Sequence, residues 1–394
     1  MSYLVGILGL LVVFGLAYLL SNNRKEIPFK SILILFIIQI VMALVMFKTA
    51  VGIKVIEAVS NFVTLVLSYG YEGIEFVTGG LVVIEGGSVF FINVLMLIIF
   101  SSTILSILTY IKVLPLTIKY LGGALARITG LSNIITFNSV SSIFFGQSEA
   151  LLAIKAHLHS MSENKLFIVC TSAMASVSAS IMGAYLTMVP AEYVLSAMVL
   201  NAISGLIIGS IIAPSKRDKD ESINIKEVSQ SDSIFGAISA GALDGGKVAL
   251  IVAAMLVAYV GLMAVINGAF NALFNISFTE ILGYIFAPVA WIMGIPASEI
   301  VTAGSIMGMK LATNEFVAML QFSPLIETLN PKTVGIVSTF LISFANFSSI
   351  GIISGSIQAI NAYKAKQVEK FGLKLLLAAT LVSVLTATMV GLVI

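Results

Sequence analysis

Residues 138–149, NSVSSIFFGQSE, decide how the rest of the sequence is interpreted. Around this stretch a short apolar run meets a polar break at Gly146–Glu149, and the apolar character then resumes. Each apolar part is too short to cross a bilayer core of about 30 Å, which needs roughly 20 apolar residues. Helices broken at membrane depth occur only where the chain is buried in protein or lines a cavity. We therefore expect a re-entrant hairpin over about residues 131–160.

The composition of the whole chain indicates a membrane protein. Of the 394 residues, 59% are hydrophobic and only 10% are charged, whereas soluble domains carry about 25% charged residues. This excludes a water-soluble globule and a disordered chain. A net charge of +2 is too balanced to attract nucleic acid, so no nucleic-acid partner is expected. The lipid bilayer is the expected surrounding.

Outward from the hairpin, eight apolar runs have the length of transmembrane helices. They cover roughly residues 2–20, 31–47, 91–111, 166–189, 191–213, 248–270, 333–358 and 373–393. If the N-terminus lies outside, this order gathers most Lys and Arg residues on the cytoplasmic side, as the positive-inside rule requires. The sequence therefore predicts an all-α integral membrane protein with eight transmembrane helices and both termini outside.

A second interrupted segment, residues 296–323, repeats the pattern of the first. Its break lies at Thr313–Phe316, and we expect a second re-entrant hairpin there. Glu149 is followed 31 residues later by Ser180, and Glu315 is followed 31 residues later by Asn346, each within a predicted helix rich in hydroxyl side chains. Paired hairpins in corresponding places of two halves indicate an inverted-repeat transporter with its site at the bilayer midplane.

The domain organisation follows from these repeats. Residues 1–90 are expected to form N-terminal scaffold spans with an interfacial helix over 49–78. Another interfacial helix is expected over 113–130, because both segments carry charges at helical spacing. The first repeat is 91–214 and the second is 236–394. The polar stretch 215–235 is expected to be a cytoplasmic linker between them.

Two carboxylates in apolar hairpins are the strongest candidates for function. A charged side chain at the bilayer centre costs about 2.5 to 3.5 kcal/mol on insertion scales and persists only with a partner, a proton or a water-filled cavity. Glu149 and Glu315 have no basic residue at i±3 or i±4, and Lys310 is the nearest candidate partner of Glu315. Burial favours the protonated form of a carboxylate, so both acids are proton-coupling candidates.

Enzyme and cofactor motifs are absent from the sequence. It contains no HExxH, no GxSxG, no P-loop and no GxGxxG after a strand, so we expect neither an enzyme nor a cofactor. Without a nucleotide-binding fold, uphill transport requires an ion gradient. A passive channel and an intramembrane enzyme remain as alternatives of other classes.

Several motifs in order resemble those of the concentrative nucleoside transporter family. They are Gly146–Glu149, Asn314–Ala318, Phe344–Gly351, Ala242–Gly245 and Ala303–Gly308. The resemblance implies a homotrimer, eight spans, two re-entrant hairpins and interfacial helices. It further implies that Gln147, Ser148, Glu149 and Ile181 contact the nucleobase, and that Glu315, Phe344, Asn346 and Ser349 surround the ribose. A uridine-like nucleoside is the implied substrate, with purine or pyrimidine preference open.

The resemblance also bears on the coupling ion. Sodium-coupled members have an Asn where this chain has Ser142, and losing an amide oxygen weakens a hard-cation site. The sequence looks more like the proton-coupled bacterial nucleoside permeases, which implies proton symport in a bacterial cytoplasmic membrane. Sodium coupling is the alternative, with Ser142, Phe145, Ser176 and Val177 as weak sodium-site candidates.

Overall fold

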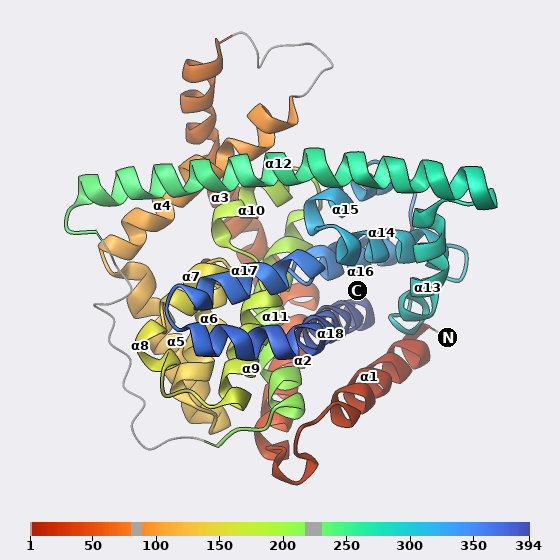
Figure 1. The fold of residues 1–394 in the computed structure, drawn as a ribbon, viewed down its shortest axis with the longest axis horizontal. Coiled ribbons are helices and arrows are strands. Elements are labelled where there is room, and N and C mark those ends of the chain that lie inside the picture. Colours follow the sequence, from red (N-terminus) through yellow and green to blue (C-terminus); the bar gives the residue numbers. More distant parts are fainter. Residues whose placement is uncertain (1, 80–88, 217–230) are drawn as a thin grey trace.

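A computed structural model describes residues 2–79, 89–216 and 231–394. Within these ranges the chain is helical and contains no strand (Figure 1), so the predicted all-α class is confirmed. The first half consists of α1 (Ser2–Leu19), α2 (Phe29–Lys48), α3 (Ala50–Thr78), α4 (Leu97–Tyr110), α5 (Val113–Thr129), α6 (Asn133–Phe144), α7 (Gln147–Leu152), α8 (Lys155–Leu158), α9 (Glu163–Met174), α10 (Ala179–Leu186) and α11 (Ala191–Ile212).

The second half begins with a long helix and repeats the order of short, interrupted helices. It consists of α12 (Ile234–Phe274), α13 (Phe278–Ile292), α14 (Ile300–Ala312), α15 (Glu315–Phe322), α16 (Pro331–Leu341), α17 (Phe347–Gln358) and α18 (Ala362–Val393). Most of the predicted linker, residues 217–230, lies outside the described residues. The predicted domain boundaries stay a prediction.

Seven helices in the described part of the chain are long and apolar enough to cross a membrane, which supports a multi-pass membrane protein. They differ from the eight predicted spans in three ways. The run 2–20 forms α1, whose apolar part, Tyr3–Leu19, is shorter than the seven. The sequence 50–78, expected at the interface, forms the continuous helix α3 and meets the length and composition of a span. The run 333–358 is divided between α16 and α17.

The helix α12 is much longer than the predicted span 248–270. At 1.5 Å per residue, its 41 residues extend about 60 Å, roughly twice the thickness of a bilayer core. Figure 1 shows it crossing the full width of the molecule, and it packs against α4. It is largely exposed and apolar, as expected of a helix that meets lipid or another subunit.

The buried core of the described chain is formed around α9, α11 and α18 and not around α12. The apolar segments of α11 and α18 are 89% buried within the chain, compared with 17% for α12. These buried helices pack against α16 and α17. The interrupted helices are therefore held in the protein interior, where their free backbone groups can find partners.

Two segments predicted as continuous helices are interrupted. The helix expected over 166–189 ends at Met174 and resumes at Ala179, and the helix expected over 333–358 ends at Leu341 and resumes at Phe347. The prediction failed here because small and apolar residues in the interruptions keep the hydropathy high. In each interruption a polar side chain, Ser178 or Asn346, caps the helix that follows.

Candidate functional site

Four helices are broken at related positions, two in each half. The second parts of these helices begin after the N-cap residues Gly146, Ser178, Asn314 and Asn346. Gly146 and Ser178 are 32 residues apart, and so are Asn314 and Asn346. Each half therefore pairs a broken hairpin with a broken helix at the same spacing.

Hydrogen bonds join the four breaks to one another. Phe344 N donates to Ser176 O at 3.3 Å, which links the two broken helices. Ser178 Oγ donates to Phe144 O at 3.5 Å, which links the first broken helix to the first hairpin. Asn346 Nδ2 donates to Glu315 Oε2 at 3.3 Å, which links the second broken helix to the second hairpin. The two breaks predicted from the sequence, in the hairpins, are thus hydrogen-bonded to two breaks that were not predicted.

Glu315 lies at the centre of these contacts. Its side chain is 4% exposed, and its Oε1 accepts a hydrogen bond from the Tyr185 hydroxyl at 3.0 Å. Its Oε2 accepts the bond from Asn346, whose own Oδ1 accepts from Ser349 N at 3.0 Å and so caps α17. No ion pair joins Glu315 to Lys310, although both are within the described residues.

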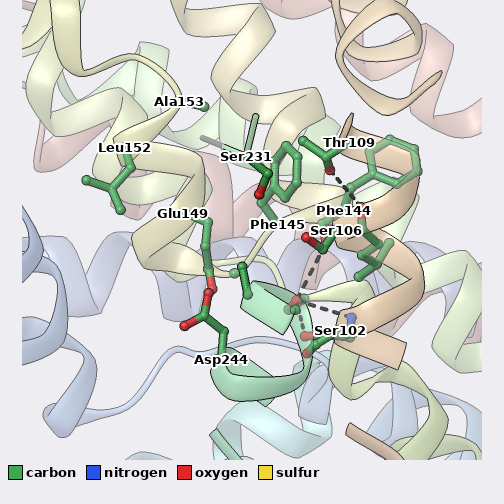
Figure 2. A pocket seen from close by; sticks show the side chains of 16 residues that line it. Ser102, Ser106, Thr109, Phe144, Phe145, Glu149, Leu152, Ala153, Ser231 and Asp244 are labelled. Atoms are coloured by element: carbon green, nitrogen blue, oxygen red, sulfur yellow. Dashed lines mark hydrogen bonds between the residues drawn. The ribbon is translucent and has the colours of Figure 1, made fainter. Parts of the chain in front are cut away.

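Glu149 has a different environment from Glu315. Its side chain is exposed and lines a cavity of about 280 Å³ between the first hairpin and the helices α4 and α12. Figure 2 shows the Glu149 carboxylate directed toward Asp244 of α12. Ser178 and Ser180 line the same cavity. Of the eight predicted substrate residues, Glu149 lines this cavity and the other seven do not.

The other predicted substrate residues are more enclosed. Gln147, Ile181, Asn346 and Ser349 are buried, and Ser148 and Phe344 are half-buried. Ser356 of α17 donates to Ser148 of α7 at 2.8 Å, so the helix carrying Ser349 packs against the helix carrying Gln147. Within the described chain, Gln147 Oε1 and Ser349 Oγ are buried without a hydrogen-bond partner. Unpaired groups of this kind are unfavourable unless a ligand or water bonds to them.

The sodium-site candidates lie at the first hairpin and the first broken helix. Ser142 Oγ donates to Asn138 O at 2.8 Å, so its hydroxyl hydrogen is used within α6. Ser176 Oγ is buried and has no partner among the described residues, whereas Ser176 O accepts from Phe344 N. A sodium ion needs several oxygen ligands, and this set offers one unpartnered side-chain oxygen.

Several residues of the site were not singled out from the sequence. Tyr185, fully buried, reaches Glu315 from α10; a tyrosine within an apolar helix was the available signal, because a buried hydroxyl needs a partner. The scaffold side of the cavity carries Ser102, Ser106 and Thr109 on α4. It also carries Asp244 on α12, which the sequence analysis noted only within the motif Ala242–Gly245. The three hydroxyl residues share one helix face, but nothing in the sequence places that face opposite the hairpin.

This architecture defines a class: a multi-pass membrane transporter whose discontinuous helices meet around buried polar groups. Three family models cover most of the chain. The "Na+ dependent nucleoside transporter N-terminus" matches residues 8–81, "Nucleoside recognition" matches 91–192, and the "Na+ dependent nucleoside transporter C-terminus" matches 193–391. The chain belongs to the concentrative nucleoside transporter family. It is therefore a nucleoside transporter and not an enzyme.

Relatives and solved structures agree with this assignment. The chain is 34% identical to the purine nucleoside transport protein NupG of Bacillus subtilis, over 100% of this chain and 99% of that protein. It is 34% identical to the nucleoside permease NupC of Helicobacter pylori, over 99% and 98% of the two chains. A structure of CNTnw in an inward-facing substrate-bound state has a TM-score of 0.94 at 32% identity and covers 100% of this chain and 99% of that one.

Proposed function

We propose that this protein imports nucleosides by symport with protons across the cytoplasmic membrane of a bacterium. Gln147, Ser148, Glu149 and Ile181 contact the nucleobase, and Glu315, Phe344, Asn346 and Ser349 contact the ribose. The observation that carries the proposal is the hydrogen-bonded junction of four helix breaks around Glu315. It gathers a carboxylate, an amide and hydroxyl groups, which complement the hydroxyls and base edge of a nucleoside.

The unpartnered oxygens support the same substrate class. Gln147 Oε1 and Ser349 Oγ have no partner among the described residues, and leaving a buried polar group unpaired costs about 1 to 3 kcal/mol. A nucleoside supplies donors for both. A ligand without the sugar hydroxyls or the base would leave such groups unpaired and bind more weakly.

Proton coupling is favoured over sodium coupling by the composition of the site. The two acids Glu149 and Glu315 lie at the hairpin tips, and neither forms an ion pair in the described chain. A carboxylate can bind and release a proton during a transport cycle, which the amide and hydroxyl groups of the site cannot. The descriptions of two matching family models name sodium, and the free Ser176 Oγ is the observation that keeps sodium coupling as the second candidate.

The same proposal includes the assembly and the movement. The exposed apolar surface of α12 and α3 suits a homotrimer in lipid, with both termini of each chain outside. Transport then moves the hairpin-containing part relative to the scaffold of α4 and α12. The cavity at Glu149 lies at this boundary, so movement there changes access to the site.

Uptake into proteoliposomes tests the proposal. Uridine and inosine are supplied separately outside vesicles, with or without an inward pH gradient and with sodium or potassium as the salt. We expect the pH gradient to drive accumulation in potassium salt. Accumulation that requires sodium and ignores the pH gradient would establish the alternative, and equilibration without accumulation under either gradient would indicate a passive channel.

A further inference from the structure

A lysine that the proposed mechanism does not use is fully buried beside the second hairpin. Lys310, on α14, is 0% exposed. Its Nζ donates to Phe340 O and Ser343 Oγ, each at 2.5 Å, and to Ser383 Oγ at 3.5 Å. It also lies 4.3 Å from the centre of the Phe340 ring. All of these hydrogen-bond acceptors are neutral.

The acceptor Phe340 O is available because of the helix break. In a continuous helix this carbonyl would accept from the N–H of residue 344. Here Phe344 N donates instead to Ser176 O of the other broken helix. The Lys310 ammonium takes the vacated place and satisfies a carbonyl that would otherwise be unpaired.

The second contact of Lys310 is with the break itself. Ser343 belongs to the extended segment that carries Phe344 and Asn346. Ser343 Oγ also lies 2.8 Å from Ser383 Oγ of α18. Lys310 thus joins the second hairpin, the broken helix and the buried helix α18 at one point.

Lys310 and Glu315 are two opposite buried charges on either side of the α14–α15 break. Each has neutral hydrogen-bond partners: Lys310 Nζ donates to Ser343 Oγ, and Glu315 accepts from Asn346 of the same segment. A buried charge without compensation is strongly unfavourable, and removing one member of a buried pair leaves the other uncompensated. Keeping both charges is therefore more favourable than keeping either one alone.

We propose that Lys310 is a positioning residue for substrate binding, which holds the broken helix α16–α17 in place and balances the charge of Glu315. It touches no substrate itself. By fixing the segment of Phe344 and Asn346, it keeps the Asn346 amide on Glu315 and orients both toward the ribose. This inference rests on the proposed role of Glu315 in nucleoside binding.

A double-mutant cycle of thermal unfolding tests the charge balance without nucleoside or gradient. The variants are Lys310→Met, Glu315→Gln and both together, in detergent. Lys310→Met is expected to lower Tm by about 10 °C, and adding Glu315→Gln is expected to restore at least half of that loss. The proposal would be overturned if the Tm of the double variant fell as far as that of Lys310→Met, or by the sum of the two single losses. If Lys310→Met does not fold, a folded double variant supports the proposal and an aggregated one overturns it.

Lys364→Met is the matched control. Lys364 is also buried, at 7% exposure, and its Nζ donates to a backbone carbonyl, Met161 O, at 2.5 Å. It lies at the start of α18, and its side chain contacts Met161 and Tyr363, which are not residues of the site. Adding Glu315→Gln to Lys364→Met should give no recovery of Tm, and recovery there would overturn the specific pairing of Lys310 with Glu315.

Uptake kinetics test the positioning. We expect the KM for nucleoside to rise about tenfold or more in Lys310→Met and to stay within twofold of the wild type in Lys364→Met. An unchanged KM in Lys310→Met would overturn the positioning role. If the wild-type protein took up no nucleoside, the proposed function would be contradicted. The double-mutant cycle of thermal unfolding would still test the charge balance between Lys310 and Glu315.

Discussion

Gly146 shows how a single residue at a helix break shapes the site. A Cβ at this position would lie 2.6 Å from Glu149 Oε2, closer than any contact allows, and the next atom lies 3.5 Å away. The backbone of Gly146 has φ −66°, so its conformation suits any residue. Glycine is therefore needed at this position to leave space for the Glu149 carboxylate, and not to allow an unusual backbone conformation.

We expect Gly146→Ala to fold normally and to bind nucleoside more weakly. The added methyl group displaces the flexible carboxylate and leaves the backbone in place, so Tm should change by less than about 3 °C while KM rises about tenfold. Uptake kinetics and thermal unfolding measure the two effects. Gly123→Ala is the control, because a Cβ there meets no atom within 4 Å.

Glu315→Gln tests the other acid at the same scale. The amide oxygen can still accept from Tyr185, so the fold should persist, but the charge and the proton site are lost. Concentrative uptake under a pH gradient is expected to disappear. Glu280→Gln, at an exposed helix start, should transport normally. Accumulation by Glu315→Gln at the wild-type level would remove Glu315 from the site.

At the scale of elements, the two breaks within the hairpins could be predicted and the two within the following helices could not. Gly146 and Asn314 interrupt the hairpins with residues that favour turns and caps. In contrast, Ala175 and Val177 in one broken helix, and Ile342 in the other, keep the apolar pattern of a span. A cap at Asn346 was visible only as a polar residue in a predicted helix.

The N-cap residues are expected to contribute to the stability of the short helices. Asn314 Oδ1 accepts from Val317 N at 3.0 Å and so caps α15. Asn314→Ala should destabilise the protein by about 1 kcal/mol, which lowers Tm by about 2 to 4 °C. Asn314→Ser should retain most of the stability, because Ser caps nearly as well. Equal losses in the two variants would contradict a capping role.

Close packing of α12 on α4 positions the scaffold side of the cavity. A Cβ on Gly245 would lie 2.6 Å from Ile99 Cα, and one on Gly241 would lie 2.7 Å from Thr103 Cα. Because these are backbone atoms, they cannot give way without moving a helix. The two glycines thus set the separation of α4 and α12 beside Asp244.

Gly245→Val is therefore expected to push α12 away from α4 and to lower both Tm and the rate of uptake. Overpacking of this kind typically costs about 1 to 3 kcal/mol. Gly246→Val is the control at the neighbouring position, where a Cβ meets no atom within 4 Å. Uptake and unfolding of the two variants should differ clearly, and equal behaviour would contradict the packing argument.

At the scale of the whole molecule, the two halves repeat their order of broken helices but do not place their acids equivalently. Glu315 is the first residue of α15, whereas Glu149 is the third residue of α7. One acid is buried against Tyr185 and Asn346, and the other faces the cavity. The sequence spacing predicted a matched pair; the structure shows two acids in different surroundings, which suits different roles.

The class and the general architecture could be predicted from the sequence because hydropathy and composition report directly on the surrounding lipid. The tertiary partners of the site could not. Tyr185 and Asp244 come from helices whose orientation the local pattern does not determine. The length of α12 was also underestimated, since its first three turns contain small and polar residues such as Ser239 and Asp244 that lower the hydropathy.

Proton movement driven by nucleoside tests the central claim most directly. Proteoliposomes in potassium salt, with equal pH on both sides and a pH-sensitive dye inside, receive an inward uridine or inosine gradient. Symport predicts acidification of the lumen that depends on the nucleoside and is absent in Glu315→Gln. Nucleoside entry with no acidification, together with sodium entry when sodium is supplied, would contradict the account.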